Sequence, residues 1–302
     1  LFNDIKSKDN YSEILKDYAI CEHMILNKKT ALKYYNKAIS VANTNLEKAY
    51  IYEQIIKLYS DFSEFKKAYE TGKEALELFD LNIPKEFSKI VYTKDSMYLN
   101  YKLKNKNPNN LISLQETKDE KIIIMIKLLS ALLKAVYQID PKLCVLVSMK
   151  LVNLCLKYGD TKDAVIGFMV FGVIFQGAIK QNHKLGYKYA NLSLEMIKKY
   201  NNSVLYPEVN FVSGYFAFSW LLPTAITEQK WFESYNKGLL IGDLFHSGCA
   251  AAGIIQSMFL RGVCLDNINN QIEIFKKKLR RINAHEQLGA ILSVKQAICK
   301  LK

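Results

Sequence analysis

A helical pattern of small and aromatic residues, which occurs twice near the start of the chain, constrains the fold most. The two segments are residues 29–42 and 66–79. Three positions carry the pattern in the first segment, Ala31, Tyr35 and Ala38, and three follow 37 residues later in the second, Ala68, Gly72 and Ala75. Residues spaced in this way share one face of a helix, and small side chains on that face let a second helix approach closely. The pattern predicts repeated pairs of packed helices.

The apolar periodicity of the first 80 residues extends this prediction to two complete hairpins. The expected helices span residues 11–26 and 29–43 in the first hairpin, and 46–60 and 64–79 in the second. Tyr59 lies on the apolar face of the third segment, where it is expected to meet Ala68 and Ala75. The 37-residue offset is close to the roughly 34-residue period of tetratricopeptide hairpins. We therefore predict an all-α fold, a right-handed superhelix of antiparallel helical hairpins that forms a tetratricopeptide-like α-solenoid.

The repeat pattern is lost after Pro84, where the segment 101–117 is polar, rich in asparagine and interrupted by proline. We expect three parts. These are N-terminal tetratricopeptide-like hairpins at 1–84, an irregular connecting segment at 85–117, and a more apolar helical-repeat lobe at 118–302 that continues the first. Helices in the third part are predicted at 119–138, 141–158, 161–180, 184–200, 205–222, 229–243, 247–262, 267–282 and 285–301.

The chain carries a formal net charge of +13, which raises nucleic acid as a partner because basic side chains neutralise phosphates. Its arginines are few, however: Arg261, Arg280 and Arg281 are all of them. Base and phosphate recognition favours the planar guanidinium fork of arginine over the point charge of lysine. A solvated lysine surface is therefore the favoured interpretation. A basic nucleic-acid-binding solenoid stays an alternative, and it requires the lysines to gather on one face.

No residue set in the sequence forms a recognisable catalytic, cofactor or metal site. Phosphate-binding loops, dinucleotide-binding glycine motifs, nucleophile elbows and kinase signatures are all absent from the sequence. The six cysteines and four histidines are scattered, without the spacing of zinc ligands. His246 follows Asp243 by three residues, a spacing that chance often produces on a helix. We expect a chain without catalytic residues, cofactor or metal.

The longest uncharged run is residues 209–227, about the length of a membrane span. It contains asparagine, serine and Pro223, so a core helix is favoured over a span. Residues 165–175 are shorter and predict a buried helix. Free thiols in apolar helical runs fit a reducing compartment, and no signal peptide opens the chain. We expect a cytoplasmic location and no membrane span.

The helix expected at 267–282 has an apolar stripe on one side and basic residues on the other. Ile268, Ile272, Phe275, Leu279 and Ile282 form the stripe. The basic residues are a candidate partner face: Lys276, Lys277, Lys278, Arg280 and Arg281. The end of a solenoid, a partner-binding helix and a membrane-surface helix all show this pattern, and we favour the first.

Four segments beyond residue 118 carry a pattern that resembles a known family. They are 140–172, 182–197, 211–223 and 238–262. In this order they resemble the helical repeat region of large bacterial multidomain signalling proteins with a predicted AAA-type ATPase, which often carry kinase-like, GAF and sensor histidine kinase domains. The positions that carry the resemblance are Gly172, Gly186, Trp220, Pro223, Gly242, Asp243 and Gly262.

Each of these positions predicts a structural role. Gly172 and Gly186 are expected to permit close helix contacts and Trp220 to fill a large volume between helices. Pro223 is expected to end its helix, and Asp243 to accept backbone hydrogen bonds at a helix start. Family members often have a histidine where Ser219 stands, so no role is transferred to that position. The resemblance implies a regulatory module that binds a protein or peptide, including flanking domains of the same polypeptide, in a concave groove. A stand-alone scaffold or effector is the alternative.

Overall fold

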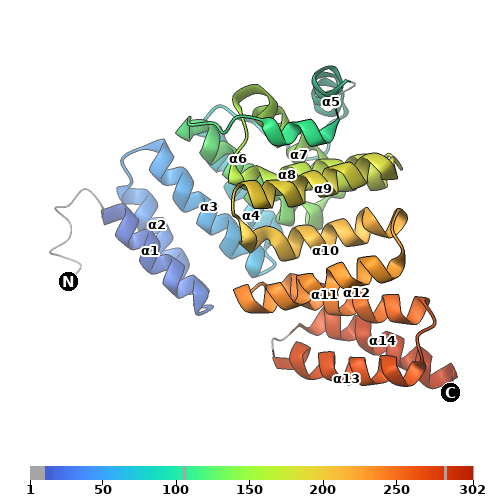
Figure 1. The fold of residues 1–302 in the computed structure, drawn as a ribbon. Coiled ribbons are helices and arrows are strands. Elements are labelled where there is room, and N and C mark those ends of the chain that lie inside the picture. The colour runs from blue at the N-terminus through green and yellow to red at the C-terminus, as the bar shows by residue number, and fades with distance from the viewer. Residues whose placement is uncertain (1–10, 105–106, 282–283, 302) are drawn as a thin grey trace. The chain divides into compact units, whose positions relative to one another are not determined.

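The computed structural model describes residues 11–104, 107–281 and 284–301. Within each of its two compact units most helices pack against helices that lie near them in the sequence (Figure 1), so the chain is an all-α helical-repeat solenoid, as predicted. Two compact units divide the chain. The first ends at Val170 and the second begins at Phe171, except that residues 107–112 belong to the second.

Unit 1 opens with the two hairpins that the sequence predicts. Their helices are α1 Tyr11–Met24, α2 Lys28–Val41, α3 Asn45–Asp61 and α4 Phe65–Glu77. The small and aromatic positions of both repeats are fully or almost fully buried, among them Tyr35 and Ala68. Tyr59 is half-buried and packs at the edge of the α1–α3 core. Part of the range 1–84 falls on residues 1–10, which lie outside the described residues.

The second hairpin is closed by a helix that follows later in the sequence. A β-carbon at Gly72 of α4 would overlap the Leu132 side chain of α6 (Glu120–Ile139). Glu53 of α3 is only 1% exposed, forms an ion pair with Lys57, and lies 3.9 Å from the ammonium of Lys127 on α6. Buried carboxylates need such partners because water no longer solvates them. Helix α6 thus serves as the partner of the α3–α4 hairpin.

The segment 85–117, expected to be irregular, contains a helix, and that part of the prediction is wrong. Helix α5 spans Lys89–Leu103 and is capped by Ser88, whose hydroxyl accepts a hydrogen bond from the Val91 N–H. Leu99 is its one fully buried residue. Because the other apolar side chains are spread around the helix, its sequence has no apolar stripe for periodicity to detect.

The remainder of unit 1 is the apolar pair α6 and α7 (Pro141–Tyr158), followed by η2 (Lys162–Ala164) and α8 (Val165–Met169). By length and composition α6 and residues 162–179 could each cross a membrane, with mean hydropathies of 1.9 and 1.5. Within the structure 56% and 72% of these windows are buried. A core helix of a soluble protein has the same properties, and the absence of a membrane span stays a prediction.

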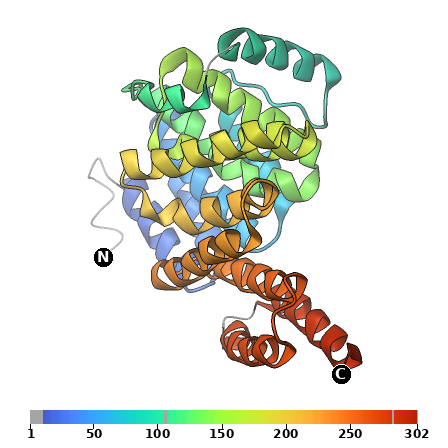
Figure 2. The same cartoon turned by 45° about the vertical axis from the view of Figure 1, so that its right-hand side comes forward.

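Unit 2 contains η1 in part and the last elements of the chain (Figure 1). Its elements are η1 Pro108–Ser113, η3 Val170–Ile179, α9 His183–Lys199, η4 Ser203–Leu205, α10 Tyr206–Phe216, η5 Phe218–Trp220, α11 Thr224–Ile241, α12 Leu244–Leu260, α13 Leu265–Arg281 and α14 His285–Leu301. The η3 segment is a π-helix, and residues 165–175 are buried as predicted, except for half-buried Ile174. The last helices, red in Figures 1 and 2, pack against each other.

Two structural roles assigned from the sequence are wrong in this unit. Trp220 does not fill a space between helices: it is 62% exposed and stacks on His183, with ring centroids 4.3 Å apart. Pro223 does not end a long helix, because α10 already ends at Phe216 and Pro223 instead precedes the first residue of α11. The chain reverses between the two helices, so the uncharged run 209–227 is not one continuous helix.

Candidate functional site

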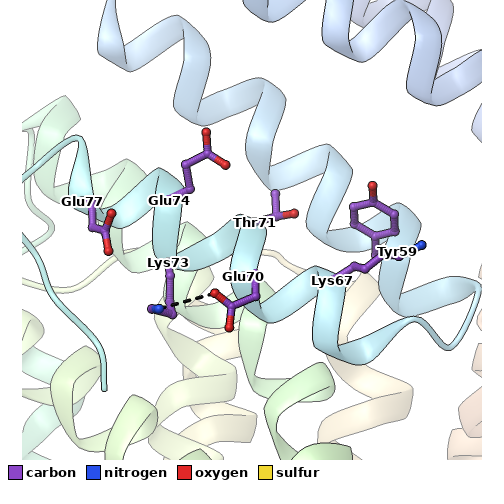
Figure 3. Close-up of a pocket in the computed structure, with 7 residues that line it drawn as sticks. All are labelled: Tyr59, Lys67, Glu70, Thr71, Lys73, Glu74 and Glu77. Carbon is purple, nitrogen blue, oxygen red and sulfur yellow. Dashed lines mark hydrogen bonds and ion pairs between the residues drawn. The ribbon is translucent and has the colours of Figure 1, made fainter. Parts of the chain in front are cut away.

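A hollow lies on the surface of each unit within the residues that the structure describes. The hollow of unit 1 has a volume of about 380 Å³ and follows one face of α4 (Figure 3). We call it the α4 hollow. Its lining residues are Tyr59, Lys67, Glu70, Thr71, Lys73, Glu74 and Glu77.

Most charges of the α4 hollow are already paired within the chain. The Lys73 ammonium lies 3.4 Å from the Glu70 carboxylate. The Tyr52 hydroxyl of α3 donates a hydrogen bond of 2.6 Å to Glu74. With one aromatic ring and otherwise polar side chains, the hollow has little apolar surface for a ligand to bury. It has the character of a solvated helix face.

The hollow of unit 2 is different in composition, and we call it the α12 groove. Its volume is about 290 Å³. Three helices line it, and α12 packs between α10 and α14. Helix α10 contributes Phe211 and Tyr215, and α14 contributes Glu286, Gln287 and Ala290. Between them, α12 contributes Cys249, Ala252, Gly253 and Gln256.

The shape of the α12 groove follows from the size of these side chains. The α12 residues recur at helical spacing and share one strip, on which Cys249 is half-buried, Ala252 and Gly253 are buried, and Gln256 is exposed. The rings of Phe211 and Tyr215, with centroids 6.1 Å apart, stand beside this strip on α10. Helices α11 and α13 form the second layer, where Tyr235 and Phe275 are in ring contact at 4.9 Å. Small residues between larger ones leave a hollow with an apolar floor.

A buried tryptophan supports this floor from below. The Trp231 indole N–H of α11 donates a hydrogen bond of 3.3 Å to the Phe211 carbonyl. A β-carbon at Gly253 would lie 3.2 Å from the Trp231 ring, and one at Gly214 would overlap the indole nitrogen. The two glycines therefore let α10 and α12 close over the indole, which fixes the positions of the groove walls.

Among the described residues that line the α12 groove, the one charged side chain is the carboxylate of Glu286. Glu286 lies exposed on the edge of the groove in the first turn of α14. Burial raises the pKa of the Cys249 thiol; the hydrogen bond from Gln287 opposes this shift, and the Asp243 and Glu286 carboxylates add to it. The Cys249 thiol is therefore protonated at neutral pH and is a poor nucleophile.

Asp243 begins α12 as predicted. Its carboxylate accepts a hydrogen bond of 3.1 Å from the His246 N–H, and the imidazole Nδ1 lies 2.9 Å from the same group. The preceding Gly242 ends α11 in the left-handed conformation, with φ of 83°, and Gly262 follows α12 with φ of 69°. All three positions act at helix ends, which is a structural role.

The other glycines singled out from the sequence lie at a helix crossing. Gly172 of η3 packs against the Tyr189 side chain of α9, and Gly186 of α9 lies against Gly177 of η3. This confirms the close contacts expected at Gly172 and Gly186. None of these positions lines the α12 groove.

The basic residues of α13 are divided between contacts and solvent. Lys276 forms an ion pair of 3.3 Å with Glu273, and Lys278 lies 5.3 Å from the Tyr235 ring centroid. The side chains of Lys277, Arg280 and Arg281 are exposed. The apolar stripe of α13 is buried as predicted from Ile268 to Leu279, while Ile282 lies outside the described residues.

Sequence reasoning missed the groove residues and their support. A signal was present in residues 248–253, Gly-Cys-Ala-Ala-Ala-Gly, a run of small residues on one helix. In the structure this run is buried except for half-buried Cys249, so small residue size alone did not mark a groove. The sequence analysis also gave no role to Trp231, which fills the volume between helices that was assigned to Trp220.

No protein-family model matches the chain, and no curated protein is significantly similar to it. Among residues 11–104, 107–281 and 284–301, no group of three or more His, Cys, Asp or Glu side chains could hold a metal ion. The geometry of the α12 groove is that of a surface which can bury an apolar side chain.

Proposed function

We propose that the chain is a non-catalytic protein–protein interaction module and that the α12 groove is its binding surface. The observation that carries this proposal is the small-residue strip of α12 between the aromatic wall of α10 and the polar edge of α14. Tyr215 is 49% exposed on that wall. Partly exposed aromatic rings beside an apolar floor are typical of the anchors around which protein interfaces form.

We further propose a regulatory setting for this module, in the cytoplasm and within a multidomain signalling ATPase or kinase. The helical-repeat fold and the resemblance in residues 140–262 support this setting. A peptide, a helix or a neighbouring domain would bind in the groove more tightly in one state of an upstream nucleotide switch than in the other. This difference in affinity would couple binding in the groove to the state of the switch.

The distribution of lysines favours a protein partner over nucleic acid. Ion pairs within the chain engage Lys28 of α2, Lys134 of α6, Lys198 of α9 and Lys295 of α14, among others. Paired lysines on many helices leave a weaker positive field than a single basic face would. A stand-alone scaffold or effector with the same groove is the remaining alternative to the regulatory setting.

The test is a pull-down with purified residues 1–302 as bait, against source lysate and against separately expressed segments that flank this region. Two variants accompany the wild type. Gln256→Trp places a large side chain in the groove from its exposed edge, and Asn236→Trp adds the same side chain at an exposed position of α11. We expect capture that survives a high-salt wash, is lost with Gln256→Trp and is retained with Asn236→Trp.

Recovery of a flanking segment would identify an intramolecular regulator, while recovery of another protein alone would favour the scaffold. Loss of every partner in high salt, with nucleic acid in the eluate, would mean that the lysine surface is the functional feature and would contradict the proposal.

A further inference from the structure

We propose that the α12 groove selects a peptide segment that carries a bulky apolar side chain with a lysine or arginine next to it, the basic group pairing with Glu286. This inference rests on the proposed function, because it names the chemistry of the partner for the same groove. It follows from the size of the groove, from its charge and from the groups along its edges.

The size of the α12 groove fits one large side chain better than a cofactor. Its volume of about 290 Å³ lies just below the range of ordinary small-molecule sites, about 300 to 1,000 Å³. Ala252 and Gly253 supply a floor that does not project into this space, and the Phe211 ring bounds it on one side. An aliphatic or aromatic side chain of a partner would bury its surface there.

The charge of the groove selects the neighbouring residue of the partner. The described lining residues include one carboxylate, Glu286, and neither lysine nor arginine, in a chain whose formal net charge is +13. Among the described residues, no hydrogen bond or ion pair engages the Glu286 carboxylate. The groove is thus an anionic site on a cationic protein, and it attracts basic groups at distances below the screening length of about 10 Å.

The aromatic wall strengthens the preference for a cation. The Tyr215 ring is half-exposed on the α10 wall, across the groove from Glu286, and its face offers a cation of the partner a second contact. The side-chain amides of Gln256 and Gln287 stand along the same groove and can hydrogen-bond to a partner's backbone in either direction. Together these groups fit an apolar–basic segment and disfavour an acidic one.

The inference can be tested with random peptides displayed on phage and selected on purified residues 1–302 at neutral pH and low salt. Enriched peptides are then synthesised, and their Kd is measured by fluorescence anisotropy for the wild type and four variants. Glu286→Gln removes the charge, Glu286→Lys reverses it, Gln256→Trp fills the groove, and Glu86→Lys is a matched charge reversal at an exposed position of unit 1. Circular dichroism verifies that each variant is folded.

We expect the enriched peptides to share an apolar residue beside lysine or arginine. Their affinity should fall about three- to fivefold with Glu286→Gln and about tenfold or more with Glu286→Lys. It should be lost with Gln256→Trp, stay unchanged with Glu86→Lys, and weaken as salt rises.

Two results would overturn the inference in distinguishable ways. In the first, the peptides lose binding with Gln256→Trp, but they lack a basic residue or bind equally well to Glu286→Lys. This result would contradict the proposed partner chemistry and leave the groove as the binding surface. Enriched peptides whose binding is unaffected by Gln256→Trp, or a selection without any enrichment, would contradict the proposed function as well.

Discussion

Gly177 of η3 lies against Gly186 of α9, so closely that a β-carbon at Gly186 would meet the Gly177 α-carbon at 2.8 Å. The neighbouring atom is backbone and cannot rotate away as a flexible side chain would. We predict that Gly186→Ala lowers the free energy of unfolding by about 1–3 kcal/mol, because the two helices must separate to admit the methyl group. Urea unfolding followed by circular dichroism measures the loss.

Gly289 provides a matched control for that substitution. It lies within α14, and a β-carbon there would meet nothing within 4 Å. We expect Gly289→Ala to raise the free energy of unfolding by about 0.5–1 kcal/mol, because alanine has the higher helix propensity. Equal effects of the two substitutions would mean that the contact between η3 and α9 is not close.

The two tryptophans should differ sharply in their contribution to stability. We predict that Trp231→Ala costs about 3–5 kcal/mol, because it empties the space under Gly214 and Gly253. Trp220→Ala should cost at most about 1 kcal/mol, since the ring is 62% exposed and its contact with His183 is a surface stack. Guanidinium unfolding of both variants makes the comparison, and a larger loss at Trp220 would contradict the packing of α10, α11 and α12.

Two aspartates of unit 1 should respond to pH with opposite signs. Burial raises the pKa of Asp163, and the charges of Lys127 and Lys162 only partly oppose it. The folded chain then holds this proton more tightly than the unfolded chain, so stability falls as pH rises from the ordinary aspartate pKa through the raised value. We expect Asp163→Asn to stabilise the protein at pH 7 and to have little effect near about pH 3, below the ordinary pKa.

Asp61 is the opposite case. Burial acts to raise its pKa, but hydrogen bonds from His23 and Lys134 outweigh burial, and the net shift is downward. Stability from these contacts is present above the ordinary aspartate pKa and is lost as pH falls through the lowered value. Asp61→Asn should therefore destabilise the protein at pH 7. Thermal unfolding of both variants from pH 3 to pH 7 tests the two signs, and a shared sign would contradict the contacts at one of the sites.

The cysteines should divide by burial in a thiol titration. Cys21, Cys264 and Cys299 are exposed, and we expect them to react quickly with an aromatic disulfide reagent at about pH 8. Burial raises the pKa of the Cys144 thiol to about 12, and it also raises that of Cys155. These two thiols should react only on unfolding. Fast reaction of either in the folded protein would contradict the α6–α7 core.

The sequence was sufficient to predict most helices, because the spacing of apolar residues and the residues typical of helix ends indicate the same boundaries. Helix α7 begins at Pro141, as expected from the sequence, and the small residues of α2 and α4 are buried. Helix α5 was missed because its apolar residues form no stripe. The break after Phe216 was missed because nothing in that uncharged run marks a helix end before Pro223.

The α12 groove could not be predicted from the sequence for a related reason. Small residues permit close helix contact, and the same residues leave a hollow where no helix covers them. The periodicity of α12 alone does not tell whether its small residues pack against another helix or line a hollow. They line a hollow because the side chains of α10 and α14 stand on either side of them. The sequence does not show that α10 and α14 flank α12, nor that Trp231 of α11 supports α10 from below.

The most direct test of the account is photo-crosslinking from a single groove position. A photoreactive phenylalanine analogue at Gln256 places the reactive group in the α12 groove, and the same residue at Asn236 places it on exposed α11. With the peptides selected on this chain, the account predicts covalent adducts from position 256 and none from position 236, with unlabelled peptide suppressing the former. Equal adducts from both positions, or adducts from position 236 alone, would contradict the assignment of the α12 groove as the interaction surface.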